Sequence, residues 1–195
     1  MQGYLHDPVS FAIGTYANLK TDSNTVVGIH VSSIYVMSSW TTYVETGFAT
    51  DVDRQLLRRS FMAYGEPYTT NGQVQVIDGT PSLPWGVWRY FEINRFSSKP
   101  GGRWEWRANV AGTVVKQTAP MLMSAGTSFV SSERELHPQD TNYLSSSNVC
   151  YRGTNGSWYM FNEPRVRYSP TGDPGYLGQW GSWWSGKRDF QVSEY

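Results

Sequence analysis

The chain has 195 residues, and its 16 lysine and arginine residues balance 16 aspartate and glutamate residues, so the formal charge at pH 7 is zero. This balance argues against a dedicated nucleic-acid-binding protein, whose phosphate contacts need clustered basic side chains. No apolar stretch approaches the roughly 20 residues of a membrane-spanning helix, so no membrane span is expected. A chain of this length usually folds as one domain around a sizeable core, and we predict a single β-sandwich domain over residues 1–195.

Short runs of β-branched, aromatic and alternating residues follow one another along the chain, which is the pattern of antiparallel strands. The tight-turn pair Asn71-Gly72 separates two of these runs, and only residues 51–59 have a pattern compatible with a helical turn. The predicted strands are residues 10–16, 25–31, 34–37, 43–48, 60–64, 73–77, 87–95, 103–110, 113–117, 128–134, 158–161 and 165–168. About a dozen short strands at this spacing predict an all-β antiparallel sandwich.

Two predicted strands show clear alternation, which assigns their side chains to opposite faces. In the run 87–95, one face carries Trp88, Tyr90, Glu92 and Asn94. In the run 103–110, one face carries Trp104 and Trp106.

The C-terminal segment differs in composition from the rest of the chain. Residues 169–186 are rich in proline, glycine, tryptophan and serine. We therefore expect residues 169–195 to form an aromatic, Gly/Pro-rich loop or tail packed on the sandwich rather than a second domain.

Features that bear on the cellular compartment point in two directions. Cys150 is the one cysteine and cannot form an internal disulfide, and the first residues lack the basic and apolar regions of a signal peptide. The 19 glycines, 13 tyrosines and 9 tryptophans are instead typical of secreted bacterial β-proteins. We expect an extracellular protein whose leader is absent from this chain.

Most kinds of catalytic site are excluded by their missing motifs. The histidines His6, His30 and His137 have no metal-ligand spacing, and there is no cysteine cluster. There is no Gly-x-Ser-x-Gly turn and no glycine-rich phosphate loop before a helix. Cys150 is most simply a small buried residue. We expect no metal and no cofactor.

Carboxylates remain as the groups that could carry hydrolytic chemistry, and two of them lie within predicted strands. Glu45 shares a face with Tyr43 and Gly47, and Glu133 shares a face with Phe129 and Ser131. Small neighbours leave room for a substrate, and two carboxylates close together can act as general acid and general base. The alternative is structural: Glu45 would lie on a solvated sheet face, and Glu133 would pair with Arg134 or Arg103.

The order of these segments resembles that of glutamic peptidases of the neprosin and eqolisin type, in particular uncharacterised secreted bacterial members. The resemblance rests on five segments: residues 25–37, Tyr-Val-Glu-Thr-Gly-Phe at 43–48, the aromatic run 60–68, the hairpin 88–113 and Ser-Ser-Glu at 131–133. It implies a concanavalin-like (jelly-roll) sandwich in which Glu45 and Glu133 form the catalytic pair. The chain departs from the family in three ways. Glu45 replaces the eqolisin glutamine, Phe48 replaces a tryptophan, and one cysteine cannot make the neprosin-type disulfides.

By this resemblance the chain is a secreted, acid-acting hydrolase in which a pair of glutamates activates water against a peptide bond. Carboxylate pKa values set the working range at about pH 3–5. The candidate walls of the substrate groove are Tyr43, Tyr64, Trp85 and Trp88. The expected partner is a polypeptide or polysaccharide substrate.

Two alternatives remain open at this point. A carbohydrate-binding, lectin-like module without catalysis would stack sugars on exposed tryptophans, either Trp104 and Trp106 or Trp183 and Trp184. A structural or assembly protein of a cell surface or particle would self-associate through the aromatic stretch 180–184.

Overall fold

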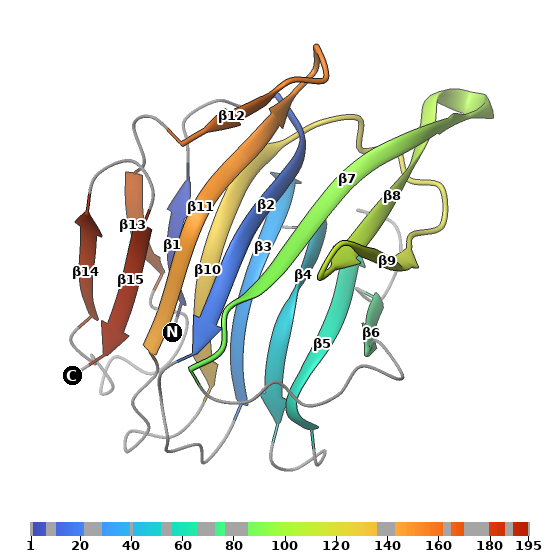
Figure 1. Cartoon of the computed structure of the whole chain (residues 1–195). Coiled ribbons are helices and arrows are strands. Elements are labelled where there is room, and N and C mark those ends of the chain that lie inside the picture. Colours follow the sequence, from blue (N-terminus) through green and yellow to red (C-terminus); the bar gives the residue numbers. More distant parts are fainter. Residues whose placement is uncertain are drawn as a thin grey trace.

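The structure is a computed structural model that describes residues 2–6, 11–21, 29–39, 41–51, 56–65, 73–76, 86–135, 143–161, 165–169, 180–185 and 189–194. Most of these residues lie in strands (Figure 1). The strands are β1 (Gln2–His6), β2 (Ala12–Thr21), β3 (Ile29–Ser39), β4 (Thr42–Asp51), β5 (Leu56–Gly65), β6 (Gln73–Val76), β7 (Arg89–Lys99), β8 (Arg103–Val110), β9 (Thr113–Gln117), β10 (Thr127–Glu135), β11 (Tyr143–Gly153), β12 (Trp158–Met160), β13 (Arg165–Ser169), β14 (Trp180–Ser185) and β15 (Asp189–Glu194). A short 3-10 turn, η1 (Pro100–Gly102), joins β7 to β8.

The strands form two antiparallel sheets that face each other (Figure 1). The seven-stranded sheet has the order β13-β1-β10-β3-β4-β5-β6, and the eight-stranded sheet has the order β14-β15-β11-β2-β7-β8-β9. β12 pairs with β11 off this path. The predicted fold class is therefore confirmed: the chain is an all-β, antiparallel concanavalin-like (jelly-roll) sandwich.

No strand was predicted at β1 or β11, and residues 29–31 and 34–37, predicted as parts of two strands, belong to β3 alone. Two further local predictions differ from the structure. Residues 56–59 lie in a segment whose pattern was compatible with a helical turn, but they belong to strand β5, because Leu56 and Arg59 pair with β4. The strands β14 and β15 lie in the segment predicted to be a loop or tail, and β15 joins them to the eight-stranded sheet through β11. In both places pairing with a neighbouring strand outweighs a weak local pattern.

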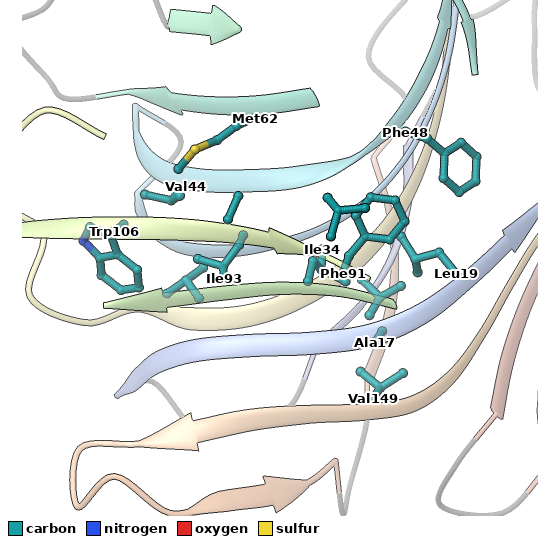
Figure 2. Packing of buried hydrophobic residues seen from close by; sticks show 14 of the residues in the cluster. Ala17, Leu19, Ile34, Val44, Phe48, Met62, Phe91, Ile93, Trp106 and Val149 are labelled. Atoms are coloured by element: carbon teal, nitrogen blue, oxygen red, sulfur yellow. The ribbon is translucent and has the colours of Figure 1, made fainter. Parts of the chain in front are cut away.

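The core lies between the sheets and consists of the inward side chains of both (Figure 2). Alternation along each strand produces it: Val44 and Phe48 on β4 face Phe91 and Ile93 on β7 across the sandwich. The buried members are Ala17, Leu19, Ile34, Val36, Val44, Phe48, Met62, Phe91, Ile93, Trp106, Ala108, Val110, Met121, Met123, Val130, Val149 and Phe161.

Trp106 is the largest of the fully buried side chains. Its indole Nε1 donates a hydrogen bond to the carbonyl of Met123 at 3.1 Å, so its one polar atom is satisfied inside the core. Trp104 is half-buried, with the Arg95 guanidinium 3.8 Å from its ring centroid. Trp104 and Trp106 therefore do not form the exposed row that the carbohydrate-binding alternative required.

Among the residues that the structure describes, no helix is long and apolar enough to cross a membrane.

Replacing Trp106 with alanine removes the largest core side chain and leaves the Met123 carbonyl without its donor. We expect Trp106→Ala to lower the free energy of unfolding by about 3–5 kcal/mol, measured by urea titration. Trp88→Ala is the matched control, because Trp88 is 46% exposed and its loss costs less than about 1 kcal/mol. Equal losses in the two variants would contradict the assignment of Trp106 to the core.

Candidate active site

Glu45 lies in the middle of β4 and points away from the core. Its neighbours Val44 and Thr46 are completely buried on the inner side of the strand, so alternation turns Glu45 to the outer face of the seven-stranded sheet. The strand register places Glu45 opposite Tyr35 on β3 and Ala63 on β5. Its side chain is half-buried, and its Oε1 atom is shielded from solvent. The carboxylate thus lies on a partly covered surface.

An aromatic pair borders Glu45 on one side. Tyr35 and Phe129 are opposite each other in the register of β3 and β10, and their rings stack at 4.8 Å with an interplanar angle of 13°. Both are nearly buried although they face away from the core, with 5% and 7% of their surface exposed. The pair forms a rigid apolar wall beside the carboxylate.

The next row of this outer face contains only small side chains at its centre. Gly47, Ser33 and Ser131 are opposite one another on β4, β3 and β10. The Ser33 and Ser131 hydroxyls are buried and hydrogen-bonded to each other at 2.8 Å. A β-carbon at Gly47 would lie 2.0 Å from the Ser32 carbonyl oxygen, so only glycine fits between β3 and β4 here.

Glu133 lies on the same outer face but not beside Glu45. The register places Glu133 opposite Val31, whereas Glu45 is opposite Tyr35, four residues along β3. The two glutamates are two strands apart, so their Cα atoms are about 17 Å apart. A carboxylate pair that shares a proton is separated by only ~3 Å. The register therefore argues against a proton shared directly between these residues. The side chain of Glu133 is outside the described part.

Of the three predicted wall residues that the structure describes, only Tyr43 lies near Glu45. Tyr43 lies on the same face of β4, two residues away, and is half-buried. Tyr64 is opposite Val44 in the register and packs against the core, so it faces the other way. Trp88 is exposed beside Lys20 of the eight-stranded sheet, with the Lys20 ammonium 5.7 Å from its ring. Trp85 is outside the described residues.

A second polar cluster, not predicted as a site, lies on the outer face of the eight-stranded sheet. The Glu92 carboxylate on β7 accepts hydrogen bonds from the Tyr90 hydroxyl and from the amides of Asn94 and Asn109, the last at 3.0 Å. The alternation of residues 87–95 contained the signal, because it placed Tyr90, Glu92 and Asn94 on one face. We name these four residues, together with Tyr16, the Glu92 cluster.

Burial changes the titration of two groups at the edge of the Glu92 cluster. Burial, helped by a hydrogen bond with Cys150, raises the pKa of Tyr16 from 10.0 to about 12. Burial also raises the pKa of the Cys150 thiol, and Cys150 is 2% exposed. A thiol with a raised pKa is a poor nucleophile, which confirms the prediction that Cys150 is a small buried residue.

In the part of the chain that the structure describes, no group of three or more histidine, cysteine, aspartate or glutamate residues could hold a metal ion.

The fold matches solved structures of glutamic peptidases. A scytalido-glutamic peptidase with a transition-state analog inhibitor has a TM-score of 0.62 and 9% sequence identity, and the match covers 99% of this chain and 97% of that chain. A second scytalido-glutamic peptidase structure, with a peptide-based transition-state analog, has a TM-score of 0.58 and 11% identity, with 99% and 97% covered. SCP-B, an eqolisin-family peptidase in complex with the tripeptide Ala-Ile-His, has a TM-score of 0.57 and 9% identity, with 99% and 96% covered.

At these identities the likeness shows a common fold. No protein-family model matches the sequence, and no curated protein matches it.

The close approach of β3 and β4 at Gly47 gives a direct test of this surface. We expect Gly47→Ala to lower the free energy of unfolding by about 2 kcal/mol or more, because the new β-carbon meets backbone atoms that cannot rotate away. The control is Ala49→Gly on the same strand, which costs about 0.5–1 kcal/mol. Urea titration measures both. If β3 and β4 left room for the new β-carbon, Gly47→Ala would stabilise the protein, because alanine lowers the conformational entropy of the unfolded chain. Such a stabilisation would contradict the close approach.

The raised pKa of Tyr16 predicts a loss of stability in alkaline solution. The unfolded phenol ionises near pH 10.0 and the folded one near pH 12. The contribution of Tyr16 is therefore complete below pH 10 and declines up to about pH 12, because deprotonation favours the unfolded chain. We expect the unfolding free energy of the wild type to fall more steeply over this range than that of Tyr16→Phe. Identical slopes would show that Tyr16 titrates normally.

Proposed function

We propose that this protein is a hydrolase of glutamic-peptidase type that cleaves a peptide bond with Glu45 at the reaction centre. The observation that carries the proposal is the position of Glu45, which lies mid-strand on an outer face, shielded at Oε1 and next to a row of small residues. The fold it shares with three structures of glutamic peptidases supports the proposal, since those structures hold transition-state analogs or a tripeptide.

The small residues Gly47, Ser33 and Ser131 suit an extended substrate. They lie between Glu45 and Glu133 but are themselves buried, and Phe61 of β5, which is 5% exposed, is opposite Gly47 in the same row. A peptide would therefore lie above these residues rather than in a groove between them. The separation of about 17 Å between the two glutamates corresponds to roughly five residues of extended chain. We propose that a substrate passes above this row and contacts both acids at different points along its length.

The two glutamates then have different roles. The carboxylate of Glu45 takes a proton from a water molecule as the water oxygen bonds to the carbonyl carbon, and it returns the proton to the amide nitrogen as the C–N bond breaks. Tyr43, two residues away on the same face, can donate a hydrogen bond to the carbonyl oxygen. Glu133 binds the substrate away from the scissile bond. We further propose that the protein acts outside the cell, where an acidic medium suits carboxylate chemistry.

The test is the hydrolysis of an unfolded protein substrate at pH ~3–5, followed by the release of new amino termini. We expect Glu45→Gln to lower kcat/KM at least ~100-fold, because the amide cannot accept the proton from water. Glu105→Gln is the matched control, since Glu105 forms an ion pair with Lys99 at 3.0 Å on the β7–β8 hairpin and should retain full activity. Full activity of Glu45→Gln would remove the proposal.

Glu133→Gln separates the two roles. A residue that binds the substrate away from the scissile bond changes KM more than kcat. If Glu133→Gln instead lowered kcat as much as Glu45→Gln, both carboxylates would act at the reaction centre. They would then form the catalytic pair that the sequence resemblance implies.

A further inference from the structure

The outer face of the eight-stranded sheet carries two guanidinium groups in one row. The register aligns Trp158 on β12, Arg152 on β11, Gly14 on β2, Asn94 on β7 and Arg107 on β8. Direct cross-strand partners point to the same side of a sheet. Because Ile93 is buried in the core, Asn94 and the rest of this row point outward. We name these five residues the basic row.

Arg152 is held flat across the sheet. Its Nε donates a hydrogen bond to the carbonyl of Gly156 at 3.0 Å, and its Nη1 lies 3.5 Å from Oδ1 of Asn94, on the far side of β2. Gly14 makes this crossing feasible, since a β-carbon there would lie 2.6 Å from the Asn94 oxygen and 3.3 Å from the Arg152 Cβ. The guanidinium is thus preorganised, and a ligand would not have to order it.

Trp158 ends the basic row as a fixed aromatic surface that is 37% exposed. Its ring meets Tyr16 edge-on, with centroids 4.8 Å apart and an interplanar angle of 67°. Tyr16 in turn packs on Tyr90 at 5.5 Å. These contacts fix one part of the indole and leave the remainder open to solvent beside Arg152, whose guanidinium carbon lies 6.0 Å from the ring centroid.

Two described carboxylates, Glu92 and Glu105, lie on the same face as the basic row, and neither forms an ion pair with its arginines. Arg107 contacts the Phe96 ring, 3.4 Å from its centroid, and neither Arg107 nor Arg152 makes an ion pair with a described residue. Glu92 is hydrogen-bonded to three uncharged donors, and Glu105 forms an ion pair with Lys99. This row therefore favours an anionic ligand.

We propose that the basic row binds an acidic oligosaccharide, with a sugar ring stacked on Trp158 and uronate carboxylates bonded to Arg152 and Arg107. An exposed indole suits the apolar face of a sugar ring, and a guanidinium binds a carboxylate with two parallel hydrogen bonds. Arg152 and Arg107 are three strands apart, about 14 Å, which several linked sugar rings span. The balanced charge of the whole chain makes a nucleic acid a poor alternative.

This surface lies on the opposite sheet from Glu45, so its test is independent of hydrolysis. The experiment is isothermal titration calorimetry of the full chain, at low salt, with an oligogalacturonate and with a neutral cello-oligosaccharide of the same length. We expect the acidic sugar to bind at least about tenfold more tightly than the neutral one. Arg152→Gln, Arg107→Gln and Trp158→Ala should each lower the affinity about tenfold.

Two controls and one competing ligand complete the test. Glu45→Gln and Phe11→Ala, the latter at an aromatic that is 67% exposed, should bind like the wild type. Thermal unfolding checks that each variant is folded. One folded variant of the basic row is enough to test whether the row binds the sugar. The absence of oligogalacturonate binding by the wild type would overturn the proposal. Equal binding of the neutral sugar or of poly-glutamate would also overturn it, as would full affinity in the folded variants of the basic row.

Discussion

The packing of the two sheets against each other sets the direction of the strand side chains that matter here. Burying Val44 and Thr46 between the sheets turns Glu45 outward, and burying Phe91 and Ile93 turns Glu92 outward on the other side. Each carboxylate therefore has its own outer face, with the core between them. Sheets that pack face to face are about 10 Å apart, so the two surfaces share no reacting atoms.

The alternation of apolar and polar residues along the chain was sufficient to predict several strands and the faces to which their side chains point. The strands around residues 43–48 and 103–110 and the outward face of Glu45 follow from neighbouring residues, because the inward positions of those strands are apolar or small. The common face of Tyr90, Glu92 and Asn94 could be read in the same way. The hydrogen-bonded cluster itself could not be predicted from alternation, because Asn109 donates to Glu92 from a neighbouring strand.

Features that depend on partners distant in sequence were not predictable from the chain alone. The face of the sheet to which Tyr64 points follows from its pairing with Val44. The distance between Glu45 and Glu133 follows from the register of β4, β3 and β10. A shift of one residue in any of these strands would move every side chain to the opposite face. The strands β14 and β15 were missed because residues 169–179, just before them, are rich in proline and glycine and predict a loop, although three of the six residues of β14 are tryptophans, which favour strands.

Among the strands that the structure describes, β9 is the last in the eight-stranded sheet, which has a consequence for association with other chains. β9 has five residues, Lys116 lies within it, and the register with β8 shifts between Ala108 and Asn109. A short strand with a charged side chain and an irregular pairing is a poor template for a further strand. Extended chains that approach this edge meet a ladder that is already distorted. Aggregation through strand addition is therefore disfavoured at β9.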